Sequence, residues 1–273
     1  MNPLGRLARA WAPPVLTRLW RSCLPREYAG SYATWDEAKR CCTGYEAPAI
    51  LDQVRWATLK VKRGEAAFER DSVLFDRVQY SWPVLAALLK AALEGGGKLS
   101  VLDFGGSLGS HYFQCREFLN DVKDVRWSVV EQPAFARCGR EEFQDDRLVF
   151  YDDFDLCART ERPRVLSLSG VLQYLEMPGA FLADALQRPF DWVLVDRTPF
   201  WNGPDRLTVQ KVPPAIYQAS YPCWIFNAES FFRRFRDGYR LVAEFEGTDR
   251  ADAPIVFKGA LFRRKDLKVE ARS

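Results

Sequence analysis

The stretch "VLDFGGSLGSHYF", residues 101–113, decides how the rest of the chain is interpreted. A short apolar run ends in Asp103, small residues follow as far as Gly109, and the only histidine of the chain, His111, comes two residues later. A buried strand that passes through a glycine-rich turn into a helix has this pattern, and such a turn lets the backbone approach a ligand. We therefore expect a ligand site at the carboxyl end of this strand.

The spacing of the glycines separates the kinds of ligand that such a turn can hold. A dinucleotide site requires G-x-G-x-x-G, and a P-loop requires a Lys followed by Ser or Thr. Residues 105–109 read G-G-S-L-G, and no such Lys follows. This spacing disfavours a nicotinamide-dependent sugar oxidoreductase and excludes a P-loop.

Short apolar runs alternate with helical patterns from about residue 81 onwards. This alternation predicts βαβ units, a mostly parallel sheet and helices on both of its faces. The last two expected strands have no helix between them, so one of them can run antiparallel. The expected strands are 99–104, 125–131, 147–153, 163–170, 191–198, 239–246 and 255–264, and the expected helices are 81–97, 110–120, 133–143, 178–188 and 227–238.

The first eighty residues have a different pattern. Thr34 and Glu37 have the spacing of a capping box, and residues 48–68 carry apolar residues at mostly helical intervals, so we expect a helical cap over residues 30–80. Residues 1–29 form a basic amphipathic segment, with arginines at positions 6, 9, 18, 21 and 26. Such a segment can lie on an anionic membrane surface. A frayed or docked helix with solvated arginines is the alternative, which Pro13 and Pro14 favour.

Composition limits the classes of function. A formal net charge of +3 over 273 residues is too small to indicate nucleic-acid binding. The seven cysteines form no C-x-x-C pair, so we expect a reducing compartment, no disulfide scaffold and no metal site. Residues 1–29 lack the long apolar core of a signal peptide or a spanning helix, and we expect a cytoplasmic protein, with peripheral membrane contact through the basic segment as an open alternative.

Residues 199–226 stand out between a strand and its helix because they are rich in proline and aromatic residues. Long loops inside compact domains are usually functional or disordered, and the aromatic content argues against disorder. We expect a substrate loop here, inside one domain that covers residues 81–265 and is followed by a tail at 266–273.

The turn "DFGGSLG" (103–109) resembles motif I of the class I S-adenosylmethionine-dependent methyltransferases, D-x-G-x-G-x-G, with Ser107 at the middle glycine. The resemblance implies that Glu131, after the second strand, binds the ribose hydroxyls, and that an acidic residue after the third strand meets the adenine. The segment "LSLSG" (166–170) is similar to the one that lines the methionine end. The implied cofactor residues are Asp103, Gly105, Gly106, Ser107, Gly109, Glu131, Gln132, Asp152, Asp153, Ser169 and Gly170.

The likeness can be narrowed further. The segments "ERDSVLFD" (69–76), "SGVLQYLE" (169–176) and "VDRTPF" (195–200), with others between residues 28 and 264, look like a family of bacterial methyltransferases. Members of that family are commonly associated with surface-polysaccharide biosynthesis. The resemblance implies a Rossmann-like class I methyltransferase fold with a seven-stranded sheet, S-adenosylmethionine as the cofactor, and a small molecule or glycan precursor as the acceptor.

Several residues are candidates for the chemistry. His111 lies in the first turn of the expected helix, where the helix dipole favours neutral imidazole, so it can act as a general base, contact the cofactor or serve a structural role. Asp196 is the second candidate base. Arg197 can bind a substrate phosphate or carboxylate, or form an ion pair with Asp196. Aromatic candidates for the acceptor pocket are Tyr174, Tyr221 and Trp224.

The leading hypothesis from the sequence is therefore O- or N-methylation of a small-molecule acceptor. A non-catalytic binding or scaffold protein in polysaccharide assembly is the alternative, and it would follow if Ser107 closed the cofactor site. The sequence does not specify an oligomeric state.

Overall fold

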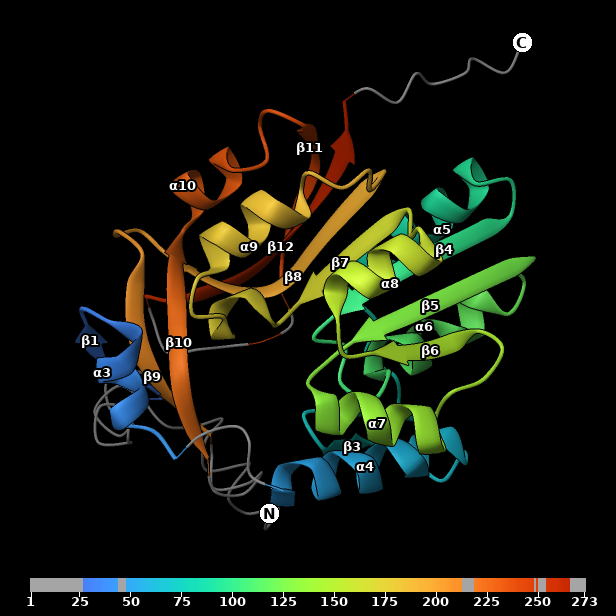
Figure 1. The fold of residues 1–273 in the computed structure, drawn as a ribbon, viewed down its shortest axis with the longest axis horizontal. Coiled ribbons are helices and arrows are strands. Elements are labelled where there is room, and N and C mark those ends of the chain that lie inside the picture. Colours follow the sequence, from blue (N-terminus) through green and yellow to red (C-terminus); the bar gives the residue numbers. More distant parts are fainter. Residues whose placement is uncertain (1–26, 44–47, 213–218, 248, 250–253, 266–273) are drawn as a thin grey trace, which may run out of the picture.

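A computed structural model describes residues 27–43, 48–212, 219–247, 249 and 254–265. The basic segment predicted at residues 1–29 lies almost wholly outside the described residues, and so does the predicted tail from residue 266 onwards. Figure 1 shows a central twisted sheet with helices on both sides.

The central sheet contains the expected parallel strands. Strands β4 (Lys98–Phe104), β5 (Asp124–Val130), β6 (Leu148–Tyr151), β7 (Val165–Ser169) and β8 (Trp192–Trp201) are parallel and lie in the order β6-β5-β4-β7-β8. Strand β12 (Val256–Arg264) runs antiparallel beside β8, and β11 (Tyr239–Glu246) pairs with β12 at the edge. This order, with one reversed strand next to the edge, confirms the predicted Rossmann-like methyltransferase fold.

Helices connect these strands and cover both faces of the sheet (Figure 1). They are α5 (Trp82–Glu94), α6 (Ser110–Leu119), α7 (Pro133–Glu142), α8 (Phe154–Glu161), α9 (Pro178–Ala185) and α10 (Ala228–Arg233), with a short 3₁₀ turn η1 (Leu172–Tyr174) after β7. Helix α8 was not expected from the sequence.

The alternation of side chains along the strands separates two apolar cores. Val101 on β4 and Val129 on β5 pack into the core under α5, α6 and α7, whereas their neighbours Leu102 and Val130 pack into the core under α8, α9 and α10. Because successive side chains of a strand point to opposite faces, a sheet buried on both faces needs continuous apolar runs. The run "VLDFG" meets this need and places Asp103 and the turn after it at the carboxyl edge.

The predicted loop at 199–226 is largely a second part of the sheet, and this expectation is corrected. Strand β8 extends to Trp201, β9 (Arg206–Lys211) and β10 (Ser220–Asn227) form an antiparallel pair, and β10 joins the end of β8 in parallel. The sheet thus has ten strands where seven were predicted, since β1 (Tyr28–Tyr32) adds to β9. Proline and aromatic residues concealed these strands, although the aromatic residues pack well on a pleated surface.

The predicted helical cap at 30–80 is partly helical. Helix α3 (Trp35–Arg40) begins with the expected capping box of Thr34 and Glu37, and α4 (Pro48–Lys62) follows. Residues 68–75, however, form the hairpin of β2 (Phe68–Arg70) and β3 (Val73–Phe75). Its two turn residues, Asp71 and Ser72, have φ of 52° and 65°, as a type I′ turn requires. The sequence has no glycine at this turn, so it gives no local sign of a hairpin. The division of the chain into domains stays a prediction.

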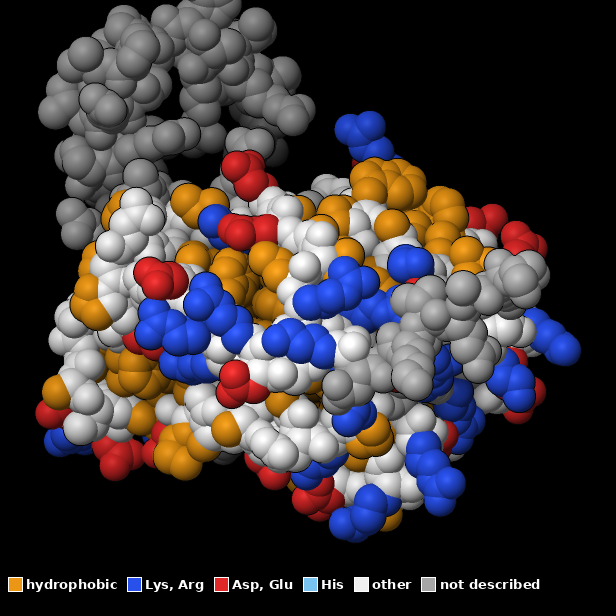
Figure 2. Space-filling model, turned by 90° about the horizontal axis from the view of Figure 1, so that it is seen from above, with side chains coloured by type: hydrophobic (Ala, Val, Ile, Leu, Met, Phe, Trp, Pro, Cys, Tyr) orange, Lys and Arg blue, Asp and Glu red, His pale blue; other side chains and the backbone are white. Residues whose placement is uncertain are grey.

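Figure 2 shows one face of the molecule, on which Lys and Arg side chains are interspersed with acidic and hydrophobic ones. No helix within the described part of the chain combines the length and the apolar character that crossing a membrane requires.

Candidate functional site

A cavity of about 1320 Å³ lies at the carboxyl edge of the parallel strands. The ends of β4, β5, β7 and β8 contribute to its wall, and so do the β2–β3 hairpin, the first turn of α6 and strands β9 and β10. Every candidate residue from the sequence lines this cavity except Gly109, Asp153 and Trp224. The fold therefore brings together residues that are spread over more than one hundred positions in the chain.

The glycine-rich turn has the backbone conformation that the motif predicts. Gly105, Ser107 and Gly109 occupy the three glycine positions of the pattern, and their φ values are 73°, 55° and 92°. Ser107 thus adopts the left-handed conformation that glycine favours. This backbone conformation costs free energy for a residue with a side chain, and the packing around the turn must offset that cost. The exception to the motif leaves the shape of the turn intact.

Glu131 is held at this turn by backbone donors. Its Oε1 accepts a hydrogen bond from the Ser107 amide at 3.2 Å, and its Oε2 accepts one from the Gln132 amide at 2.8 Å. Burial raises the pKa of this carboxyl, and the two amides partly offset the effect. Since each carboxylate oxygen can accept two hydrogen bonds, Glu131 retains the capacity to bind a vicinal diol.

Two more polar groups mark the strand ends beside the turn. Asp103 is fully buried, its Oδ2 accepts a hydrogen bond from Trp127 Nε1 at 3.1 Å, and burial raises its pKa to about 6. Ser169, at the end of β7, has a buried hydroxyl with no hydrogen-bond partner among the described residues. Asp152 lies at the rim, where Arg140 contacts it at 3.3 Å.

Three of the predicted site residues do not line the cavity and instead make contacts elsewhere in the fold. Gly109 precedes α6, where an added Cβ would lie 3.0 Å from the Leu148 side chain. Asp153 caps α8 by accepting a hydrogen bond from the Leu156 amide at 2.6 Å. The Trp224 indole donates to the Leu175 carbonyl at 3.1 Å.

His111 on α6 and Asp196 on β8 both line the cavity, and Asp196 lies near enough for its charge to raise the pKa of His111. Burial lowers the pKa of His111 to about 4, so the imidazole is neutral at pH 7, as predicted, although burial is the main cause and the Asp196 charge opposes it. Burial raises the pKa of Asp196, whose Oδ1 accepts a hydrogen bond from the Arg197 amide at 2.9 Å. The neutral imidazole of His111 can therefore accept a proton, and the carboxylate of Asp196, where it is ionised, is a stronger base than usual.

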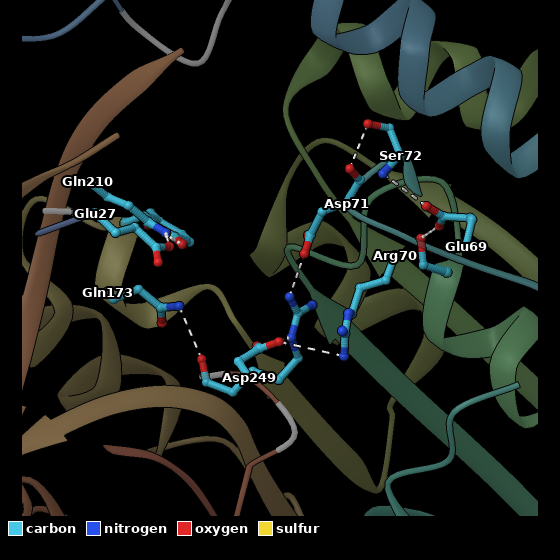
Figure 3. Close-up of polar contacts among 11 residues, drawn as sticks. Glu27, Glu69, Arg70, Asp71, Ser72, Gln173, Gln210 and Asp249 are labelled. Atoms are coloured by element: carbon cyan, nitrogen blue, oxygen red, sulfur yellow. Dashed lines mark hydrogen bonds and ion pairs between the residues drawn. The ribbon is translucent and has the colours of Figure 1, made fainter. Parts of the chain in front are cut away.

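Arg197 connects three parts of the chain and does not pair with the carboxylate of Asp196. Its Nη2 lies 2.7 Å from Asp71 of the β2–β3 hairpin, and its Nε lies 2.6 Å from Asp249, in the connection between β11 and β12. Arg70 adds a further contact to Asp249 at 3.5 Å, and Figure 3 shows these charged groups converging. The guanidinium is therefore already bound by two carboxylates, and Arg197 itself has a φ of 51°.

Glu69, on β2, is a cavity residue that the sequence did not single out. It is only 2% exposed, and it accepts hydrogen bonds from the Ser110 hydroxyl and, at 3.3 Å, from the Ser72 amide (Figure 3). Burial raises its pKa to about 7. The Ser110 contact places Glu69 against the first turn of α6, next to His111.

The opposite wall is aromatic and polar. The rings of Tyr174 and Tyr221 meet edge to face with centroids 5.0 Å apart. Tyr174 donates to Gln210 Oε1 at 2.8 Å, and Gln210 donates in turn to Glu27 Oε1 at 2.9 Å. Figure 3 shows Gln210 and Glu27 across the cavity from Glu69. Two of the three aromatic residues predicted for the acceptor pocket thus line the cavity, and their contact with an acceptor stays a prediction.

One reason explains why four residues of the cavity could not be identified from the sequence. Glu69, Asp71, Gln210 and Asp249 reach the cavity through the hairpin, the added strands and a connection near the carboxyl terminus. Local spacing carries no signal for such contacts. Residues 69–76 belong to the segments that carry the family likeness, which implies no role for Glu69 or Asp71.

Comparisons with known proteins give structural likeness alone. No family model matches the chain, and no curated protein matches it either. Among solved structures, the N-terminal domain of EvdMO1, crystallised in the presence of SAH and D-fucose, is 16% identical, with a TM-score of 0.48, over 77% of this chain and 97% of that one.

Two further structures are similar at the same level. The 1,6-didemethyltoxoflavin-N1-methyltransferase of Burkholderia thailandensis is 15% identical over 87% of this chain and 93% of that one, with a TM-score of 0.43. The magnesium protoporphyrin IX methyltransferase of Synechocystis PCC 6803 is 11% identical over 79% and 98%, with a TM-score of 0.48. The assignment of the fold therefore rests on the strand order and on the conformation of the turn.

Proposed function

We propose that the protein transfers a methyl group from S-adenosylmethionine to a small-molecule acceptor, by O- or N-methylation. The observation that carries the proposal is the turn after β4, whose three motif positions all have positive φ and whose Ser107 amide holds Glu131 at the cavity. A turn that presents amides and a fixed carboxylate at the carboxyl edge of a parallel sheet suits a nucleoside ligand.

The residues present fit this cofactor. Glu131 can accept hydrogen bonds from the ribose diol, and Gln132 and Asp152 line the adjoining wall, where the base would lie. The buried hydroxyl of Ser169 lacks a partner among the described residues, so it can bind the methionine portion together with the backbone near Gly105. When bound, the cofactor supplies an electrophilic methyl group on a sulfonium.

The chain itself would supply position, exclusion of water and a proton acceptor. A hydroxyl acceptor must lose a proton as it attacks, and an amine that binds as ammonium must give up one proton before its nitrogen can attack. His111 is neutral and Asp196 has a raised pKa, so either can take that proton, and the geometry leaves the choice between them open.

The alternative of a non-catalytic scaffold rested on closure of the cofactor site by Ser107. Ser107 instead keeps the left-handed conformation, and it donates its amide to Glu131. We retain as part of the proposal a glycan precursor or another small cytoplasmic molecule as the acceptor.

Titration calorimetry of the full chain with S-adenosylmethionine and with S-adenosylhomocysteine tests the proposal. We expect both ligands to bind with micromolar dissociation constants, and NAD not to bind. Absence of binding at millimolar concentrations of both ligands would remove the proposal.

A further inference from the structure

The acceptor end of the cavity is the part bounded by the β2–β3 hairpin, the first turn of α6 and β8. It holds two buried carboxyl groups that form no salt bridge with a described residue. Glu69 is 2% exposed and Asp196 is 4% exposed. Within the described part of the chain, neither forms a salt bridge. Their hydrogen-bond donors are neutral: the Ser110 hydroxyl and the Ser72 amide for Glu69, and the Arg197 amide and the Ser81 hydroxyl for Asp196. A buried carboxylate without a cation is costly, and a positively charged ligand would remove that cost.

The two carboxylates flank one feature, the first turn of α6. Glu69 binds Ser110, the first residue of the helix, and Asp196 interacts with His111, the second. His111 is neutral and so cannot compensate either negative charge. The charge of the nearby Arg197 guanidinium lowers the pKa of both carboxyl groups, but its ion pairs are with Asp71 and Asp249 and with neither of the two.

A third group at this end is an acceptor without a donor. Gln173 is 2% exposed and lines the cavity, and its Nε2 donates to the Arg197 carbonyl at 3.2 Å (Figure 3). That bond fixes the orientation of the amide, because the reverse orientation would set two oxygens against each other. Gln173 Oε1 then has no partner among the described residues. An unpaired buried acceptor needs a donor from elsewhere.

Two hydrogen-bond donors on the facing wall are already bonded to acceptors of the protein. The Tyr174 hydroxyl donates to Gln210, and the Gln210 amide donates to Glu27. The acceptor end therefore offers hydrogen-bond acceptors and negative charge beside aromatic rings, a combination that suits an ammonium group.

The residues that line the whole cavity also include more acidic than basic side chains. Among the described residues that line it, eight carry carboxyl groups and three are Lys or Arg. Such a cavity attracts cations and repels phosphates and carboxylates. The carboxyl residues are Glu27, Glu69, Asp71, Asp103, Glu131, Asp152, Asp196 and Asp249.

We propose that Glu69, Asp196 and Gln173 form a subsite for the ammonium group of an amine acceptor. This inference rests on the proposed function, and it narrows the acceptor from a hydroxyl or an amine to an amine without phosphate or carboxylate groups near the reacting nitrogen. An organic cation could also be the sulfonium of the cofactor, so the experiment separates these two sources.

The test uses three probes of similar shape on the full chain saturated with S-adenosylhomocysteine, whose sulfur is uncharged. Benzylamine, benzyl alcohol and benzoate are titrated by calorimetry at pH 8, which is above the raised pKa of Glu69 of about 7 and at which benzylamine remains largely protonated. We expect benzylamine to bind at least ten-fold more tightly than the other two probes. Comparable or tighter binding of benzoate would overturn the proposal, and so would the failure of all three probes to bind.

Variants assign the effect to the subsite. Glu69→Gln and Asp196→Asn each keep the shape of the side chain, and each should weaken benzylamine binding about ten-fold. Asp184→Asn, which alters an exposed ion pair with Arg188, should leave it unchanged. If Glu69→Gln does not fold, Asp196→Asn and the comparison of the three probes still decide the matter.

The sulfonium alternative predicts a different result. In that case the wild type would bind S-adenosylmethionine more tightly than S-adenosylhomocysteine, Glu69→Gln and Asp196→Asn would abolish this preference, and benzylamine would not bind the S-adenosylhomocysteine complex. That outcome overturns the amine assignment. If S-adenosylhomocysteine itself does not bind, the proposed function fails, and the same probes on the free protein still test the cation subsite.

Discussion

At the scale of single residues, Glu131 is the side chain whose position is most closely defined by the turn. Replacing it with alanine removes a carboxylate that two amides hold in place. We expect Glu131→Ala to weaken binding of S-adenosylhomocysteine by about 1–3 kcal/mol, the usual value of hydrogen bonds to a charged group. Titration calorimetry measures this change directly.

The matched control for Glu131 is another carboxylate that follows a strand of the same sheet. Asp153 caps α8, so Asp153→Ala should cost about 1 kcal/mol of unfolding free energy and leave the affinity unchanged. Equal losses of affinity in the two variants would contradict the role of Glu131.

Ser107 gives a prediction about backbone strain. Its φ of 55° is one that glycine adopts without cost. Ser107→Gly should therefore keep or raise the free energy of unfolding, and Ser107→Val should lower it by about 1–3 kcal/mol. Urea unfolding checks both values. As a control, Ser31→Gly in strand β1 should cost about 0.5–1 kcal/mol, since glycine weakens a strand interior. A loss of stability in Ser107→Gly as large as in Ser31→Gly would contradict this interpretation.

At the scale of elements, the Arg197 cluster joins the β2–β3 hairpin and the β11–β12 connection to the end of β8. Asp249 contacts both Arg197 and Arg70, so Asp249→Asn weakens two ion pairs at once. We expect it to lower the free energy of unfolding by about 1–3 kcal/mol, because the groups are largely shielded from water.

The comparison for this cluster is an ion pair on the surface. Asp184 is 68% exposed beside Arg188, and Asp184→Asn should change the stability by no more than about 1 kcal/mol. Urea unfolding of both variants at 0.1 M and 1 M salt measures the difference. Similar losses in both variants would show that the cluster does not hold the hairpin in place.

The elements also show how far the sequence could go. The strands around residues 101–113 were predictable because continuous apolar runs and a glycine turn are local signals, and the role of Glu131 was implied by the resemblance to class I methyltransferases. The hairpin was not predictable in the same way, since its turn residues Asp71 and Ser72 adopt positive φ without glycine. Strands β9 and β10 were concealed by prolines, and Asp249 reaches the site from a connection whose position only the tertiary structure defines.

At the scale of the whole molecule, the added strands and the hairpin contribute further walls to the cavity at the carboxyl edge of the parallel strands. The parallel strands supply the side at which the turn and Glu131 lie, and β9, β10 and the hairpin supply the facing walls. The candidate cofactor residues therefore come from locally readable motifs. The proposed acceptor subsite combines Asp196 of β8 and Gln173 of η1 with Glu69 of the added hairpin, which explains why the sequence revealed only part of it.

Because carboxyl groups in this cavity are buried, the free energy of unfolding depends on pH. The pKa of Glu69 rises from an ordinary 4.5 to about 7 in the folded protein, and that of Asp103 rises from 3.8 to about 6. Between those values the folded state binds more protons than the unfolded state, so each contribution is fully present below the ordinary pKa and is lost as the pH rises through the folded pKa. His111 acts in the opposite direction, because its pKa falls from 6.5 to about 4.

Since these effects oppose each other in the wild type, the contribution of Glu69 is best seen as a difference. The amide in Glu69→Gln does not titrate, so the stability of the wild type relative to this variant should fall by about 1–3 kcal/mol between pH 5 and pH 8. Urea unfolding at four pH values measures it, with Asp184→Asn as the variant that should run parallel to the wild type. Parallel curves for Glu69→Gln would mean that Glu69 is ionised in the folded protein at pH 5, which the burial of its carboxyl without a cation argues against.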